Sequence, residues 1–476
     1  MTISKNWATI LVINVCTIVL SFLFKGTTLM TCILVLWIDI MYYTLSDLKN
    51  RSAFFAFAVS FFTFLIGREE MEVFGIHEIQ FEFTDSLNAL AHRIVLIGLI
   101  SLIAGYWIGC HVMIGKKKTA RIIDVESREY TTIRKLSKIL YYITFVALLM
   151  QVLDVIRYVF RHGYLAFYTG YTTSLPYVFI KIGDMSIIAF WVFLATLPRR
   201  EEARTPILLY AVYLMITLLT GKRYECVAGF LILFVYLLFR NSTDRGKEWV
   251  KLRHIVMVLV LVPIGTTALY AIRDIRVGGA LTADTFRSGM TEFFYTQGVS
   301  INVIKRMEKY LSLLPKGKFY SFGATLDFLH NNIISRIIGI QTYTGNTVDH
   351  ALQGNQLQHA LSYVIMGSYY LQGHGYGSCY LAEAYHDFGY IGVIVCNIIY
   401  GLIFRRWMHF EGKGIWELTI MLIALKAFML SPRGNADGFV ASLLDFTTWG
   451  TILIIYFASK VLLKQRYSVF KERKRT

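Results

Sequence analysis

A stretch of the chain that follows a glycine-rich turn carries the side chains best suited to acid–base chemistry. Three glycines lie between residues 373 and 377, and Glu383, His386 and Asp387 come after them at spacings of three and four. On a helix these spacings put the three side chains on one face. A carboxylate or an imidazole placed in this way can take the proton from a substrate hydroxyl as a general base. We rank Glu383 first for this role; the competing interpretation is a solvated amphipathic connector.

Basic side chains form a second candidate group, in three clusters that the hydropathy pattern places at one membrane depth. The clusters contain Lys222 and Arg223, Arg273 and Arg276, and Arg433. Guanidinium groups bind phosphate oxygens through two parallel hydrogen bonds and stay charged at any relevant pH. The three clusters therefore indicate a diphosphate carried on a lipid in the outer leaflet. Alternatively, each arginine extends to the interface and pairs with a nearby carboxylate. The sequence offers Glu225, Asp274 and Asp437 as such partners.

The composition indicates which elements must position these residues. Hydrophobic residues make up 55% of the 476 residues, charged residues only 17%, and the mean hydropathy is +0.52. A water-soluble chain of this length would carry fewer apolar residues, whereas a bilayer core of about 30 Å takes roughly 20 apolar residues per helix. We predict an all-α polytopic membrane protein with about twelve transmembrane helices. The predicted helices begin near residues 7, 27, 51, 93, 138, 176, 206, 223, 254, 391, 414 and 438.

The placement of charge predicts the orientation of these helices. The net charge is +17, and basic residues of membrane proteins collect on the cytoplasmic side. With the N-terminus inside, about 28 basic residues fall on the inner side and about eight outside. Both termini are therefore predicted to be cytoplasmic, and one long extracytoplasmic loop with short helices faces outward. The predicted order is helices 1–9 in residues 1–272, the loop in 273–390, helices 10–12 in 391–464 and a basic cytoplasmic tail in 465–476.

Two local features refine this topology. The predicted helices near 206 and 223 are separated only by the turn from Gly221 to Arg223, so they should form a helical hairpin. The acidic stretch from Glu69 to Glu82 falls on the outer side, as the long loop does.

Several function classes lack their sequence motifs. The chain has no nucleotide-binding glycine loop and no dinucleotide fingerprint, and its outer histidines lack the i, i+4 spacing of a helical zinc site. Five of the six cysteines fall in predicted helices, which leaves Cys379 without an outer partner for a disulfide. Membrane topology explains the basic charge, which argues against nucleic-acid binding. We expect no metal and no other cofactor.

Three phrases in the second half of the chain resemble a known family. They are the run from Tyr376 to Gly392, the phrase from Phe294 to Ser300 and the hairpin turn from Thr220 to Glu225. Together they are similar to the Wzy-type O-antigen and capsular polysaccharide polymerases, which are integral-membrane glycosyltransferases of the GT-C type related to the O-antigen ligases. The first four predicted helices match this family by hydropathy alone.

The resemblance implies an enzyme that uses no nucleotide sugar and no metal. Such an enzyme moves a growing glycan from undecaprenyl diphosphate onto the terminal sugar of a repeat unit that is itself linked to undecaprenyl diphosphate. The reaction takes place on the outer face of the bacterial cytoplasmic (inner) membrane, where arginines hold the departing diphosphate and a carboxylate or histidine assists the acceptor hydroxyl. Besides membrane lipids, a flippase and a chain-length regulator of the same pathway are the implied partners.

Tyrosines of the outer loop are candidates for contacts with the glycan, because their rings stack on sugar faces and their hydroxyls form hydrogen bonds. The alternative for each tyrosine is interfacial anchoring or packing inside the loop. We assign Tyr376 and Tyr380, together with Gln297, to the glycan-binding site.

Two other functions share this layout. The related ligases carry a His-Asn pair where this sequence has Gly377 and Ser378, which weakens a ligase interpretation although His374 and His386 lie on either side. A secondary transporter, including a flippase of lipid-linked oligosaccharides, usually shows two similar halves. No such repeat is visible in this sequence.

Ionisable residues inside the predicted helices need an explanation of their own, because one charge at the bilayer centre costs about 2.5–3.5 kcal/mol. Lys181 and Asp184 lie three residues apart, as do Asp154 and Arg157. We expect each of these two pairs to neutralise itself within its helix.

Overall fold

The computed structural model is helical throughout the part that it describes and contains no strand there. It describes residues 3–24, 26–77, 82–114, 124–221, 223–243, 249–251, 291, 295–408 and 413–473. The predicted all-α class is confirmed for these residues.

Nine helical stretches of the described chain are long and apolar enough to cross a membrane. They are α2 (Thr28–Leu45), α3 (Leu48–Phe61) continued by η1 (Phe62–Ile66) and α4 (Gly67–Val73), α5 (Asp85–Ile114), α6 (Arg128–His162), α8 (Tyr177–Ala195), α9 (Arg200–Thr217) continued by η2 (Leu218–Thr220), α10 (Arg223–Thr243), α19 (Tyr380–Met408) and α22 (Phe446–Arg473). The chain is therefore a multi-pass membrane protein.

The other three predicted spans differ from these nine. The first falls in α1 (Ile3–Leu23), whose apolar part, Thr9–Ser21, is short, and the span near 414 falls in α20 (Ile415–Met429). A helix of 15 residues is only about 22 Å long. The span near 254 lies outside the described residues. The count of twelve therefore stays a prediction.

The last predicted span begins in the wrong place. The sequence indicated one helix from about 438, but a separate short helix, α21 (Gly438–Leu444), begins at that position, and the long helix α22 begins only at Phe446. Asp445 has an extended backbone and its carboxylate accepts a hydrogen bond from the backbone N–H of Thr448 at 3.1 Å. An aspartate in this position caps a new helix and interrupts the apolar run.

The hairpin predicted near residues 206 and 223 is present. The helices α9 and α10 pack on each other and are joined through η2 and Gly221, whose φ of 81° is left-handed. Glycine takes this conformation without the strain that other residues incur.

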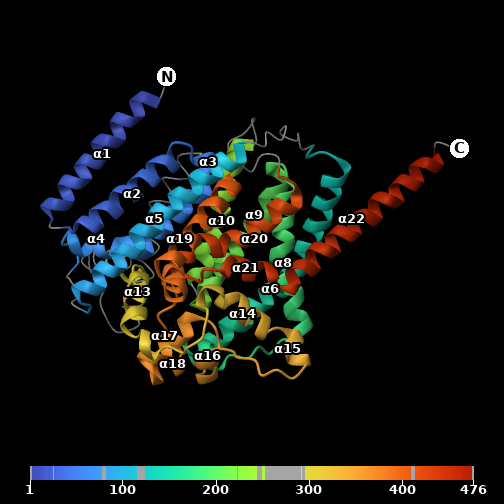
Figure 1. Ribbon diagram of the computed structural model, residues 1–476. Helices are drawn as coiled ribbons and strands as arrows, with labels where there is room; N and C mark the ends of the chain where they lie inside the picture. Colours follow the sequence, from blue (N-terminus) through green and yellow to red (C-terminus); the bar gives the residue numbers. More distant parts are fainter. Residues whose placement is uncertain are drawn as a thin grey trace, which may run out of the picture.

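Short helices gather at one end of the bundle (Figure 1), opposite the end at which α1 begins and α22 ends. Most of them belong to the predicted extracytoplasmic loop, and we call the described residues 295–379 of this loop the outer segment. Its short helices are α13 (Ser300–Lys309), η3 (Leu311–Leu313), η4 (Tyr320–Phe322), α14 (Gly323–His330), α15 (Ile333–Ile337), α16 (Val348–Gln353), α17 (Leu357–Met366) and α18 (Ser368–Leu371). Two further short helices are α7 (Ala166–Gly170) and η5 (Ser431–Arg433). The predicted topology, with both termini on one side of the membrane and the long loop on the other, is compatible with this arrangement. The topology and its cytoplasmic side stay predictions.

The helix α19 is held against α5 by an unusually close approach of two backbones. A Cβ atom added to Gly105 would lie 2.3 Å from the carbonyl oxygen of Ile398, and one added to Gly401 would lie 2.3 Å from that of Leu102. Small residues permit such contacts between membrane helices. The buried core shared by α5 and α19 also includes residues of α13 and α17. The outer segment is therefore packed directly on the helix that carries Glu383.

Candidate functional site

Arg433 lies in the turn η5 after α20 and contacts neutral partners. Its Nη1 atom donates to the side-chain Oε1 of Gln297 at 2.8 Å and lies 3.5 Å from the Gln297 carbonyl oxygen, while the guanidinium carbon is 5.5 Å from the ring centroid of Phe64. Burial lowers the pKa of Arg433, although a guanidinium stays charged at neutral pH. No carboxylate among the described residues forms an ion pair with it.

Two of the three carboxylates that the sequence offered as ion-pair partners are engaged elsewhere, and the third, Asp274, lies outside the described residues. Glu225 pairs with Lys426 of α20. Asp437 accepts hydrogen bonds from the backbone N–H groups of Ala324 at 3.2 Å and Thr325 at 2.7 Å. The alternative in which Asp437 neutralises Arg433 is therefore wrong. A desolvated cation whose partners are neutral gains from an anion. As far as the described residues show, Arg433 is therefore available for an anionic ligand.

Glu383 positions the turn that carries Arg433. Its side chain is fully buried and accepts hydrogen bonds from Ser378 Oγ at 2.5 Å, Asn435 Nδ2 at 3.0 Å and the Ala436 backbone N–H at 2.7 Å. Both carboxylate oxygens thus have donors. Asn435 and Ala436 follow Arg433 closely in the chain, so Glu383 connects α19 to this turn.

His386 and Asp387 form a hydrogen-bonded pair one turn further along α19. The Nδ1 atom of His386 lies 2.8 Å from Asp387 Oδ1, and the Asp387 side chain is fully buried. Asp387 also accepts the backbone N–H groups of Tyr320 at 3.1 Å and Ser321 at 2.7 Å. When Nδ1–H donates to the carboxylate, Nε2 keeps its lone pair. No described residue forms a hydrogen bond with Nε2, so this atom can accept a proton.

Two carboxylates hold the start of α14 on the helix bundle. Asp387 binds two backbone amides just before this helix and Asp437 binds two in its first turn. Buried backbone N–H groups need such acceptors. The spacing of acidic residues in the sequence did not show this anchoring role.

The predicted glycan-binding residues lie in different surroundings. Gln297 contacts Arg433, and Tyr376 is half-buried beneath Arg306, whose guanidinium carbon lies 3.9 Å from the ring centroid. Tyr380 is fully buried: its ring stacks on Tyr400 and its hydroxyl donates to Asn397 at 2.7 Å. In this structure Tyr380 packs the bundle, and no sugar can reach its ring without a rearrangement. Other outer tyrosines that are fully enclosed in the same way are Tyr295, Tyr320 and Tyr370.

A group of ion pairs that joins α4, the segment before α5 and α13 was not predicted. The pairs are Arg68 with Glu72 at 3.8 Å, Lys305 with Glu69 at 2.6 Å and Arg306 with Glu82 at 2.6 Å. Gly298 lies against Arg68, so this group adjoins the segment that carries Gln297. Two features of the sequence could have indicated this group of ion pairs. They are the acidic stretch after residue 68 and the neighbouring basic residues Lys305 and Arg306 of the amphipathic α13. Unlike Arg433, these cations already have carboxylate partners.

The remaining predicted cations cannot be placed. Lys222, Arg273 and Arg276 lie outside the described residues. Arg223 begins α10, but its side chain also lies outside them. Their predicted contact with a diphosphate stays a prediction.

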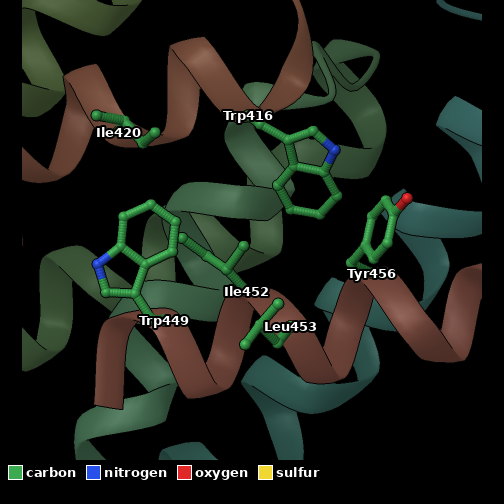
Figure 2. A pocket seen from close by; sticks show the side chains of 6 residues that line it. All are labelled: Trp416, Ile420, Trp449, Ile452, Leu453 and Tyr456. Atoms are coloured by element: carbon green, nitrogen blue, oxygen red, sulfur yellow. The ribbon is translucent and has the colours of Figure 1, made fainter. Parts of the chain in front are cut away.

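An apolar pocket of about 240 Å³ lies between α20 and α22 (Figure 2). It is lined by Trp416, Ile420, Trp449, Ile452, Leu453 and Tyr456. No charged group lines it, and its α20 residues lie in the first turns of that helix, away from Arg433. The pocket therefore lacks the chemistry of the candidate site.

The described part of the chain shows no cluster of three or more side chains that could bind a metal ion. Whether the reaction is metal-independent stays a prediction.

The helical bundle has several potential spans, and short helices lie at one end of it together with Arg433, which has no carboxylate partner in the described part of the chain. These features define a multi-pass membrane protein with a polar site at one end. The profile of the family described as "O-antigen polysaccharide polymerase Wzy" matches residues 5–466. The chain therefore belongs to this family, and the sequence resemblance is confirmed over nearly the whole chain. Comparisons with curated proteins and with solved structures gave no match.

Proposed function

We propose that this protein polymerises O-antigen or capsular polysaccharide by transferring a growing glycan from undecaprenyl diphosphate onto the terminal sugar of an undecaprenyl-diphosphate-linked repeat unit. Family membership supports an enzyme that polymerises O-antigen. The observation that carries the finer proposal is Arg433, a partly desolvated guanidinium whose side-chain partner is the neutral amide of Gln297.

The chemistry explains why such a cation is needed. The acceptor hydroxyl attacks the anomeric carbon of the donor, the bond from that carbon to the phosphate oxygen breaks, and the diphosphate leaves with the electron pair. A fixed cation at the departing oxygen stabilises the charge that develops there. Arg433 supplies this cation in our proposal, and Arg223, Arg276, Lys222 and Arg273 are the proposed additional contacts.

The proton of the acceptor hydroxyl needs an acceptor of its own. We assign this role to His386 Nε2, because Asp387 orients the ring through Nδ1. Glu383, first in the sequence-based ranking, has donors on both oxygens and positions the Arg433 turn instead. Gln297 and Tyr376 are the proposed contacts with the glycan.

The proposal includes the surroundings of the enzyme. The active site faces the outer side of the bacterial inner membrane, and no metal is needed since guanidinium groups neutralise the diphosphate. A flippase supplies the repeat units, and a chain-length regulator acts on the product.

The test is a reaction of the purified protein in detergent with a defined undecaprenyl-diphosphate repeat unit, followed by product sizing. A ladder of glycan lengths is expected, and Arg433→Ala should abolish it. Movement of the lipid-linked unit across vesicles without lengthening would instead identify a flippase. Transfer of whole chains to a different acceptor lipid would identify a ligase.

A further inference from the structure

The edge of the outer segment exposes a group of large aliphatic side chains. Ile337 and Ile338 are 77% and 66% exposed. The neighbouring exposed aliphatic residues are Leu329, Ile333, Ile334 and Ile340. We call these six residues of α14, α15 and the turn after them the isoleucine patch. A water-facing loop gains nothing from such a concentration of apolar surface, which usually marks a contact site.

The isoleucine patch is continuous with the lipid-facing surface of a membrane-spanning helix. Phe328 of α14 lies 5.9 Å, between ring centroids, from Phe446, the first residue of α22. Phe446 is itself exposed, as are the apolar residues Leu453, Ile454 and Phe457 further along α22. Figure 1 shows α15 at the edge of the group of short helices, on the side from which α22 extends.

The length of α22 fixes the depth of this patch. Its apolar span, Phe446–Lys464, has 19 residues, and 19 residues of helix extend about 28 Å. This length matches the hydrocarbon core of a bilayer, about 30 Å. Phe446 therefore lies at the boundary between hydrocarbon and headgroups, and Phe328 packs on it at that level. The isoleucine patch begins at the next residue of the chain.

Arg336 places a positive charge beside the isoleucine patch, at the level expected for the lipid headgroups. It stands between the exposed isoleucines of α15, is exposed itself and forms no ion pair with any residue that the structure describes. An arginine beside an apolar surface extends to the headgroup level, where phosphate groups are available.

We propose that the isoleucine patch inserts into the outer leaflet of the phospholipid bilayer and holds the outer segment against the membrane, with Arg336 binding lipid phosphates. The apolar side chains leave water while the guanidinium stays at the interface, as in amphipathic membrane anchors. Asp387 binds amides just before α14 and Asp437 binds amides in its first turn. Through α14, this anchor therefore fixes the outer segment relative to the bundle and to the membrane surface.

Photo-crosslinking of the full-length protein tests this proposal. p-Benzoylphenylalanine replaces Ile337, and the protein is irradiated in nanodiscs of phosphatidylethanolamine and phosphatidylglycerol. The expected product is a protein with one added phospholipid mass. The matched control carries the same photoreactive residue at Leu371, an exposed leucine of α18, and should give several times less lipid adduct.

Three outcomes overturn the proposal. Crosslinked dimers in place of lipid adducts would show that a second copy covers the patch, equal lipid adducts at both positions would show nonspecific contact, and no adduct at Ile337 would show that water covers it. In the Ile337 variant, Arg336→Gln should also lower the share of phosphatidylglycerol among the adducts. An unchanged share would remove the phosphate-binding role of Arg336.

Discussion

The Nη1 atom of Arg433 lies 2.8 Å from Oε1 of Gln297, so an amide faces this guanidinium where a carboxylate would neutralise it. An amide oxygen orients the guanidinium through a hydrogen bond and leaves its charge available. The segment of Gln297 and the turn of Arg433 come from distant parts of the chain, and Glu383 fixes the second of them. Arg433 is therefore held in position by neutral contacts and can bind an anion without a large rearrangement.

Gln297→Glu is expected to weaken donor binding because the new carboxylate would neutralise Arg433 in place of the diphosphate. The KM for the lipid-linked donor should rise by roughly tenfold, and by more than in Gln297→Ala, which removes the hydrogen bond without adding a charge. Steady-state kinetics with a defined donor measure this difference. Equal KM values for the two variants would mean that Arg433 does not meet the diphosphate.

Arg433→Lys keeps the charge but loses the planar fork, since an ammonium group cannot form two parallel bonds to one phosphate. Polymerisation should fall roughly 10- to 100-fold, as seen in the ladder of product lengths. Arg161→Lys is the matched control, because Arg161 is an exposed arginine at the end of α6, and should polymerise normally. A normal ladder from Arg433→Lys would exclude Arg433 from the donor site.

Hydropathy and local residue spacing predicted much of the architecture, whereas the orientation inferred from charge placement stays a prediction. The helical class, the α9–α10 hairpin and the pairing of Lys181 with Asp184, at 3.0 Å, are confirmed. These features depend on local sequence: apolar length, a glycine in a turn and a spacing of three on one helix. The break at Asp445 was missed because one capping carboxylate outweighs an otherwise apolar run.

The roles of individual carboxylates could not be predicted, because helical spacing gives the face of a residue but not its neighbour on another element. Asp154 was expected to pair with Arg157 and instead accepts hydrogen bonds from Tyr171, Thr173 and Ser174 of the following loop. Glu383 was expected to face a substrate and instead binds Asn435 and Ala436, more than 50 residues away. Only the tertiary structure brings these donors to the carboxylates.

Asp387→Asn should slow transfer strongly, because an amide can donate to Nδ1 of His386 and so leave the proton on Nε2. The loss of a general base typically lowers the rate by about 10²- to 10⁴-fold, and kcat should fall more than KM rises. The control is Asp437→Asn, because Asp437 likewise accepts backbone amides that hold the start of α14 but contacts no histidine. If both variants lower kcat equally, Asp387 serves only to anchor α14.

Glu383→Gln is expected to lower stability together with activity. Glutamine keeps the shape of the side chain, but its NH₂ group would face one of the three donors that now meet the carboxylate. One unsatisfied buried donor costs about 1–3 kcal/mol, so the thermal midpoint should fall and the KM for the donor should rise as Arg433 shifts. A loss of kcat at an unchanged thermal midpoint would return the general-base role to Glu383.

Acid should loosen the outer segment through His359 and Asp327. Burial, reinforced by the charge of His350, lowers the pKa of His359 to about 3, against about 6.5 in an unfolded chain. Between these values the unfolded state binds more protons than the folded state, so stability falls as the pH drops below about 6.5. For Asp327 burial opposes ionisation, but hydrogen bonds from His350, Asn355 and Gln356 hold its pKa below the usual value, which adds a further loss below about pH 4.

Hydrogen exchange of peptides from residues 323–371, corrected for the intrinsic rate at each pH, measures this loosening. Protection in the native protein should decrease from pH 7 to pH 5, because local opening exposes His359 to protonation. His359→Gln has no charge to gain, so its protection should not change over this interval. His330→Gln is the matched control, since the His330 ring stacks on Tyr343 at the surface of the same segment, and it should keep the native pH dependence. If His359→Gln keeps that dependence as well, another group accepts the proton and the neutral buried state of His359 does not set the acid sensitivity of this segment.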